Sequence, residues 1–164
     1  GVLVPLVNSP EIAARVARAC RYAPEGTRGM GLARAQRYGV GFQDYVAGAN
    51  REIAAIVQAE HIEAVNHIDA IAAVPGIDAI FVGPYDLSAS MGKPGQVQDP
   101  EVQAAIRTVR DATLRAGLKL GIYCSDPESA RDYLRQGYTL IGMGTDLNYL
   151  AQSALAARSS VKRE

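Results

Sequence analysis

The stretch that decides the fold is Phe81-Val82-Gly83-Pro84-Tyr85-Asp86-Leu87-Ser88. The short apolar run over residues 79–82 contains β-branched and aromatic side chains, which predicts a buried strand. Gly83-Pro84 ends that strand at once, and Asp86 follows as an isolated carboxylate. In α/β proteins the carboxyl ends of the strands are where ligands bind, so Asp86 is a candidate functional residue.

A second apolar run, over residues 53–57, has the same form. It ends in Gln58-Ala59-Glu60, and a helical pattern follows. Two neighbouring strands therefore each deliver a carboxylate at the carboxyl end. We expect the chain to hold Glu60 and Asp86 over one spot.

A strand–helix order repeats five times along the chain. The predicted strands cover residues 1–7, 53–57, 79–82, 118–123 and 139–143. They are uniformly apolar rather than alternating, which indicates a parallel α/β sheet buried on both faces. Two architectures remain open at this point. Five units complete an open sheet of flavodoxin type, whereas in an eight-stranded (β/α)8 barrel they form only the second part.

Three helix starts share one signal, a capping residue followed by proline and glutamate. They are Ser9-Pro10-Glu11, Asp99-Pro100-Glu101 and Asp126-Pro127-Glu128. Other helical patterns cover residues 42–50, 62–73 and 147–157, with a short turn at 32–38 and a long loop at 22–31. We expect one domain over residues 1–158 and a polar tail over residues 159–164.

The composition excludes several classes of protein. The 164 residues contain 17 Lys plus Arg and 17 Asp plus Glu, so the chain lacks the positive charge that nucleic acids or anionic membranes attract. No apolar run approaches the ~20 residues of a membrane span, and we expect no signal peptide. Cys20 and Cys124 lack metal-type spacing, which predicts a reducing, cytoplasmic setting.

Glu60 and Asp86 are the candidate metal ligands. Two carboxylates without a Cys or His partner favour a hard divalent cation such as Mg²⁺ or Mn²⁺. The alternative is structural, in which Asp86 caps its turn through Ser88 and Glu60 caps the following helix. Gln58 faces the same side of its strand as Glu60 and either bonds a substrate oxygen or satisfies a neighbouring polar group.

Other polar residues give weaker signals. His61 and His67 are expected at the solvent or at an interface, and Arg28 and Arg34 either meet an anionic substrate or make surface ion pairs. Residues 142–144 suggest a phosphate cradle, although a single Gly-x-Gly is weak evidence.

Tyr123 and Cys124 end the fourth strand at the same rim as the carboxylates. Cys124 is interpreted as a packing residue rather than a nucleophile, because it has no evident basic partner.

Four motifs resemble those of the HpcH/HpaI aldolase family, which are metal-dependent pyruvate aldolases. They are Val4-Pro5-Leu6-Val7, residues 21–29, Gln58-Ala59-Glu60 and residues 83–88. The resemblance implies a (β/α)8 TIM barrel of the phosphoenolpyruvate/pyruvate type, of which this chain is the C-terminal five βα units. We therefore expect the natural protein to carry about 90 more N-terminal residues, or another chain to supply the missing strands.

The resemblance also implies site residues and partners. Matched by position, the metal ligands are Glu60 and Asp86, and the substrate-binding residues are Gln58, Gly83, Pro84, Tyr85 and Tyr123. Tyr85 and Tyr123 depart from the smaller or aliphatic residues usual in the family. The implied cofactor is Mg²⁺ or Mn²⁺, with Co²⁺ as another option, and the implied substrates are pyruvate or an oxo acid and an aldehyde.

The implied activity is cleavage or formation of 4-hydroxy-2-oxo acids through a pyruvate enolate. The family's catalytic base and its carboxylate-clamping arginine match no residue here. The family also forms hexamers in which the region 147–157 packs on a neighbour. Two alternatives are an acyl-CoA lyase of the citramalyl or malyl type, and a non-catalytic partial-barrel assembly module.

Overall fold

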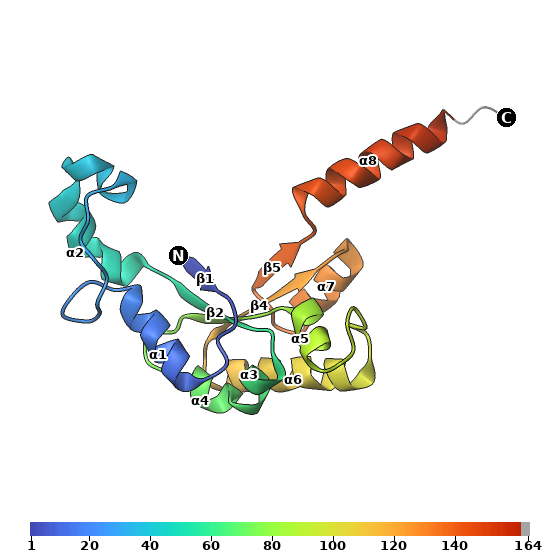
Figure 1. Ribbon diagram of the computed structural model, residues 1–164, viewed down its shortest axis with the longest axis horizontal. Coiled ribbons are helices and arrows are strands. Elements are labelled where there is room, and N and C mark those ends of the chain that lie inside the picture. Colours follow the sequence, from blue (N-terminus) through green and yellow to red (C-terminus); the bar gives the residue numbers. More distant parts are fainter. Residues whose placement is uncertain (162–164) are drawn as a thin grey trace.

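A computed structural model describes residues 1–161 and contains a five-stranded parallel sheet. The strands β1 to β5 span Val2–Val4, Ala55–Ala59, Ala79–Val82, Lys119–Cys124 and Leu140–Met143. Each strand pairs with the next strand in the sequence. This order lacks the reversal that an open flavodoxin-type sheet requires, so the flavodoxin alternative is wrong. The sheet curls as an open part of a barrel (Figure 1).

Helices alternate with the strands, as the sequence pattern predicts. They are α1 Pro10–Ala19, α2 Phe42–Glu52, α3 Ile62–Asn66, α4 Ile68–Ala72, α5 Pro84–Ser90, α6 Pro100–Arg115, α7 Pro127–Arg135 and α8 Asp146–Ser160, with the 3-10 helix η1 at Arg34–Gly39. In Figure 1, α1, α3, α4 and α6 gather on one face of the sheet, whereas α8 extends away from the body of the chain. No helix within residues 1–161 has the length and apolar character needed to cross a membrane.

The helix starts confirm the capping signals. The side chains of Ser9, Asp99 and Asp126 each accept a backbone N–H of the first helical turn, and a proline follows each of them. α6 and α7 are each followed by a glycine with positive φ, Gly117 at 73° and Gly137 at 93°. Local chemistry therefore sets where these helices begin and end.

The two faces of the sheet differ in burial. The side chains that face the helices are almost fully buried and include Val57, Ile80, Leu120, Ala59, Val82 and Ile122. The opposite face carries Gln58 and Phe81 in register, and both are only half-buried. The prediction that the strands are buried on both faces is therefore wrong for this chain, because the described helices cover one face only.

The first strand is shorter and more exposed than predicted. It spans Val2–Val4 instead of residues 1–7, and Val2 and Leu3 are each 42% exposed because β1 forms an edge of the sheet. The backbone then turns at Leu6, where φ is 53°, and Val7 enters the core at 1% exposure. This turn matters for the site described below.

Two helix predictions also need correction. The pattern over residues 62–73 forms two short helices, because His67 adopts a non-helical conformation (φ −107°, ψ 11°) between α3 and α4. The predicted polar tail at residues 159–164 begins inside α8, which continues to Ser160, and residues 162–164 lie outside the described part of the chain. No residue of α8 is buried.

Candidate active site at the carboxyl ends of β2, β3 and β4

The predicted substrate-binding residues meet in one pocket of about 170 Å³ at the carboxyl ends of the central strands. Its lining consists of Gln58, Phe81, Gly83, Pro84, Tyr85, Asp86 and Tyr123. The parallel register explains the convergence, because Gln58 pairs with Phe81 on β3, and Gly83 and Asp86 follow that strand directly. Phe81 is the lining residue that sequence reasoning missed.

Phe81 fills the inner face of the sheet because two neighbouring residues have no side chain. A Cβ atom on Gly121 of β4 would lie 2.5 Å from Cδ2 of Phe81, and one on Gly142 of β5 would lie 3.3 Å from its Cζ. The aromatic ring thus forms the floor of the pocket. In the sequence, the glycines within the fourth and fifth predicted strands were the available sign that a large side chain fills the space beside them.

Glu60 is 5% exposed and lies beside this pocket. Its Oε1 accepts the backbone N–H of Leu6 at 2.9 Å, and its Oε2 accepts Nε2 of Gln58 at 2.5 Å. The interpretation of Glu60 as a helix cap is wrong, because His61 is the N-cap of α3 and its Nδ1 accepts the Glu63 N–H. Glu60 is instead held at the end of β2.

Gly83 allows Glu60 and Gln58 to approach the start of α5. A Cβ at position 83 would lie 2.8 Å from Nε2 of Gln58, 2.8 Å from Oε2 of Glu60 and 2.9 Å from Cβ of Glu60. Those distances are too short for any side chain, so glycine is required there by the close approach. The two polar side chains therefore pack directly on the backbone that leads to Asp86.

Asp86 lies in the first turn of α5 rather than in a loop. Its structural interpretation as a cap through Ser88 is wrong, because the Ser88 hydroxyl donates to the Tyr85 carbonyl oxygen at 2.7 Å. Asp86 lines the pocket next to Gly83 and Tyr85.

Asp86 affects the ionisation of Glu60. Burial raises the pKa of Glu60, and the nearby Asp86 carboxyl group raises it further. The Leu6 amide and the Gln58 side chain oppose that rise by donating to the carboxylate. A buried carboxylate beside a second one is unfavourable without a counter-charge.

A hard divalent cation matches this donor set. Carboxylate oxygens are the ligands that Mg²⁺ and Mn²⁺ prefer, and a cation would relieve the repulsion between Glu60 and Asp86. Within residues 1–161, no cluster of three or more His, Cys, Asp or Glu side chains forms a larger metal site. Mg²⁺ commonly binds through one or two carboxylates and completes its shell with water and substrate oxygens.

Two tyrosines form one wall of the pocket. The Tyr85 and Tyr123 rings meet edge to face with centroids 6.1 Å apart. Behind them lies a smaller pocket of about 50 Å³ that shares Pro84, Tyr85 and Tyr123 and extends to Asp126 and Tyr133. The aromatic pair thus separates the carboxylates from the loop that follows β4.

The weaker candidates lie elsewhere. The Arg28 guanidinium stacks on the Tyr22 ring, 4.6 Å from its centroid, and donates to the Tyr45 hydroxyl at 2.9 Å, so it holds the long loop 22–31 against α2. His67 Nδ1 lies 3.0 Å from the Asn8 carbonyl oxygen. Burial raises the pKa of the Cys124 thiol, which supports a packing role.

The suggested phosphate cradle at residues 142–144 contacts Tyr149 of α8. The Tyr149 hydroxyl donates to the Met143 carbonyl oxygen at 2.8 Å. It also lies 2.7 Å from where a Cβ on Gly144 would be. The segment therefore packs on α8, and the Gly144 N–H donates to the Cys124 carbonyl oxygen at 3.0 Å, so this amide is not free for an anion.

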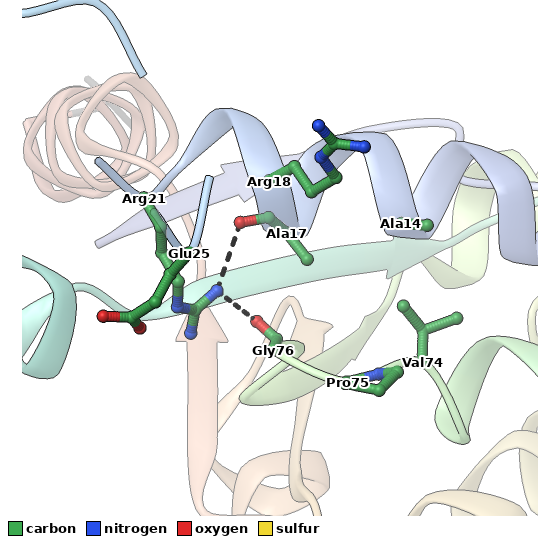
Figure 2. Close-up of a pocket in the computed structure, with 8 residues that line it drawn as sticks. All are labelled: Ala14, Ala17, Arg18, Arg21, Glu25, Val74, Pro75 and Gly76. Carbon is green, nitrogen blue, oxygen red and sulfur yellow. Dashed lines mark hydrogen bonds between the residues drawn. The ribbon is translucent and has the colours of Figure 1, made fainter. Parts of the chain in front are cut away.

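A larger hollow of about 470 Å³ lies between the end of α1 and the loop before β3 (Figure 2). Its central polar group, Arg21, donates to the Ala17 carbonyl oxygen at 3.2 Å and to the Gly76 carbonyl oxygen at 2.7 Å. Arg21 also pairs with Asp78. These bonds tie α1 to the amino end of β3, opposite to the carboxylates, so this hollow is separate from the candidate site.

Comparison with known proteins identifies similar sequences and one similar family model. The family model described as HpcH/HpaI aldolase/citrate lyase matches residues 1–153. The chain is 44% identical over 163 residues to the hydroxypyruvate/pyruvate aldolase of Chromohalobacter salexigens. The aligned region covers 98% of the present chain and 64% of that protein. It is also 43% identical over 159 residues to the 4-hydroxy-2-oxovalerate aldolase of Rhodococcus jostii. That alignment covers 96% of the present chain and 61% of the relative.

A solved structure shares the fold. The HpcH/HpaI aldolase/citrate lyase family protein from Burkholderia cenocepacia superposes with a TM-score of 0.92 at 36% identity, over 98% of this chain and 64% of that one. The present chain thus spans somewhat less than two thirds of the length of these three proteins. Its curled sheet with alternating helices corresponds to part of a (β/α) barrel.

Proposed function

The chain belongs to the HpcH/HpaI aldolase/citrate lyase family, and on that premise we propose that it supplies the metal-binding part of a divalent-metal-dependent aldolase. The proposed reaction is the cleavage or formation of 4-hydroxy-2-oxo acids, with pyruvate or a related oxo acid and an aldehyde as partners. The observation that carries the proposal is that Asp86 lines the pocket while Glu60 lies directly beside it, bonded to Gln58 of the lining and packed next to Gly83.

The proposed roles follow from the contacts. Glu60 and Asp86 hold the cation, which is Mg²⁺ or Mn²⁺, with Co²⁺ as another option, and which when bound supplies Lewis-acid stabilisation of the enolate. Gln58 keeps its side chain beside both Glu60 and the pocket, where it bonds a substrate oxygen. The catalytic base matches no residue of this chain.

The segment Gly83–Tyr85 is proposed to face the substrate carboxylate. The Gly83 N–H is already bonded to the Ala59 carbonyl oxygen at 3.3 Å, and Pro84 has no N–H. The Tyr85 N–H, in the first turn of α5, finds no acceptor among the described residues. The Tyr85 N–H is therefore the backbone donor of this segment that can bind the carboxylate of an oxo acid.

A Schiff-base mechanism has little support among the described lysines. Hydrogen bonds from Lys93 to Asp99 and Glu101 raise the pKa of its amine, which keeps it protonated and unreactive. Lys119 begins β4, at the opposite end of that strand from Tyr123 and Cys124. The acyl-CoA lyase alternative needs basic groups for the CoA phosphates, and no Lys or Arg lines the described pocket.

We further propose assembly into a homo-oligomer, with a hexamer as the expected form, in a reducing cytoplasmic setting. Support for assembly comes from α8, where Leu147, Leu150 and Leu155 are 72%, 68% and 59% exposed. Both cysteines are free thiols, in line with a reducing compartment.

The decisive test combines metal binding with aldol cleavage in the natural protein. Glu60→Gln and Asp86→Asn are each expected to weaken Mn²⁺ binding by at least ~10-fold and to abolish metal-dependent cleavage of a 4-hydroxy-2-oxo acid. Glu63→Gln is the matched control, because that carboxylate is exposed and close in sequence but outside the pocket. Unchanged Mn²⁺ affinity in both site variants, or cleavage that survives exhaustive chelation, would contradict the proposal.

A further inference from the structure

Leu6 has a backbone conformation that leucine rarely adopts. Its φ is 53°, in the left-handed region, which is unfavourable for a residue other than glycine. The Leu6 side chain is 57% exposed, so burial of that side chain does not offset the cost. The compensation must come from the backbone or from its neighbours.

Two contacts provide it. The Leu6 N–H donates to Oε1 of Glu60 at 2.9 Å, and the next residue, Val7, is 1% exposed and donates its N–H to the Gln58 carbonyl oxygen at 3.3 Å. The left-handed turn lets the chain direct one amide at the carboxylate and send the following side chain into the core. The strain at Leu6 is thus linked directly to Glu60.

Both carboxylate oxygens of Glu60 are therefore held. The Leu6 N–H donates to Oε1 and Nε2 of Gln58 donates to Oε2, and the missing Cβ of Gly83 leaves the room in which Oε2 lies. Each carboxylate oxygen still has a second lone pair for a further ligand. A carboxylate fixed in this way loses little conformational entropy when it binds a cation.

We infer that Leu6 is a positioning residue, whose strained backbone amide holds Oε1 of Glu60 and presets that carboxylate for a divalent cation. The inference rests on the proposed metal-binding function and extends it to a residue outside the pocket lining. It acts through Glu60 and does not touch the substrate.

The test replaces the donor without changing any side chain. In the natural protein, the amide at Leu6 is exchanged for an ester by incorporation of the α-hydroxy acid that corresponds to leucine. This change removes the N–H and is expected to weaken Mn²⁺ binding by at least ~10-fold. The same exchange at Val2 is the matched control, because its N–H donates to the Ala54 carbonyl oxygen at the same 2.9 Å but lies at the other end of β1.

One further measurement separates positioning from general stability. Hydrogen exchange of the Leu6 amide is expected to be slow in the parent and faster in Glu60→Ala.

The outcomes are distinct. Mn²⁺ binding that is lost in Glu60→Gln but equal in the two ester variants would overturn the inference alone, as would equal exchange rates of the Leu6 amide in the parent and in Glu60→Ala. Absence of Mn²⁺ binding by the unmodified natural protein would overturn the proposed function and the inference together.

Discussion

The aromatic ring of Tyr85, at the start of α5, meets the ring of Tyr123, near the end of β4, edge to face at an interplanar angle of 64°. Tyr85 is 45% exposed and Tyr123 is half-buried, so the pair stands at the rim of the pocket. Edge-to-face pairs contribute about 0.5–1.5 kcal/mol beyond the area they bury. The contact therefore joins two elements of the site and presents an apolar wall to whatever lies beside the carboxylates.

Tyr123→Leu tests the role of that wall. Loss of the ring removes an aromatic surface, so the kcat/KM of the natural protein for an aromatic aldehyde acceptor is expected to fall at least ~5-fold relative to that for a small aliphatic aldehyde. Steady-state aldol addition with both acceptors measures the ratio. Tyr38→Leu in η1, where the side chain is 73% exposed, serves as the control. An unchanged ratio would show that the acceptor does not contact Tyr123.

Gly83→Ala tests the close approach of Glu60 and Gln58. Gly83 has φ −104°, which alanine tolerates, so the effect comes from collision of the new Cβ and not from backbone strain. We expect displacement of Glu60 and a loss of Mn²⁺ affinity of at least ~10-fold, measured by titration calorimetry. At Gly29, nothing lies within 4 Å of an added Cβ, so Gly29→Ala is expected to leave the affinity unchanged. Equal affinities in the two variants would contradict the geometry.

Glu60→Gln is expected to stabilise the metal-free protein at neutral pH. Burial raises the pKa of Glu60 above its ordinary value of 4.5, so the folded state holds the proton more tightly than the unfolded state does. The stability of the parent therefore falls as the pH rises from about 4.5 through the folded-state pKa, and the glutamine variant avoids that loss. Thermal melts in the presence of a chelator should show a higher Tm for the variant at pH 7 and a difference that shrinks toward pH 4.

Added Mg²⁺ should reverse the order in that experiment. The cation stabilises the parent by binding to its folded state and has no comparable effect on Glu60→Gln. A variant that is less stable than the parent at neutral pH in the presence of chelator would show that the hydrogen bonds to Glu60 outweigh its burial.

The sequence predicted the parts of the fold that depend on local chemistry. Caps at Ser9, Asp99 and Asp126 are set by neighbouring residues, so the pattern located them directly. Convergence of Gln58 and Asp86 on one pocket was also predictable, because parallel strands end at the same edge. Strand order then excluded the open flavodoxin-type sheet, which the sequence pattern had left open.

What the sequence did not predict depends on contacts between distant residues. The Leu6 N–H reaches Glu60 across 54 positions, and nothing in the local sequence indicates a left-handed leucine. The break at His67 was not predicted either, and there the His67 side chain contacts the distant Asn8 carbonyl oxygen. The burial of β1 was overestimated because an apolar run cannot distinguish an edge strand from a central one.

The 164-residue chain alone is expected to self-associate. β1 and β5 form the two edges of the sheet, with apolar residues such as Leu3 and Leu140 exposed at 42% and 38%, and no residue of α8 is buried. Open edges and exposed apolar surface favour pairing with another chain. Sedimentation velocity should therefore show species larger than a monomer. Leu150→Glu with Leu155→Glu should reduce that association if α8 contributes to it, whereas Val40→Glu, at a 90% exposed position before α2, controls for added charge. A monodisperse monomer with a cooperative thermal transition would show that five βα units are stable with both sheet edges open.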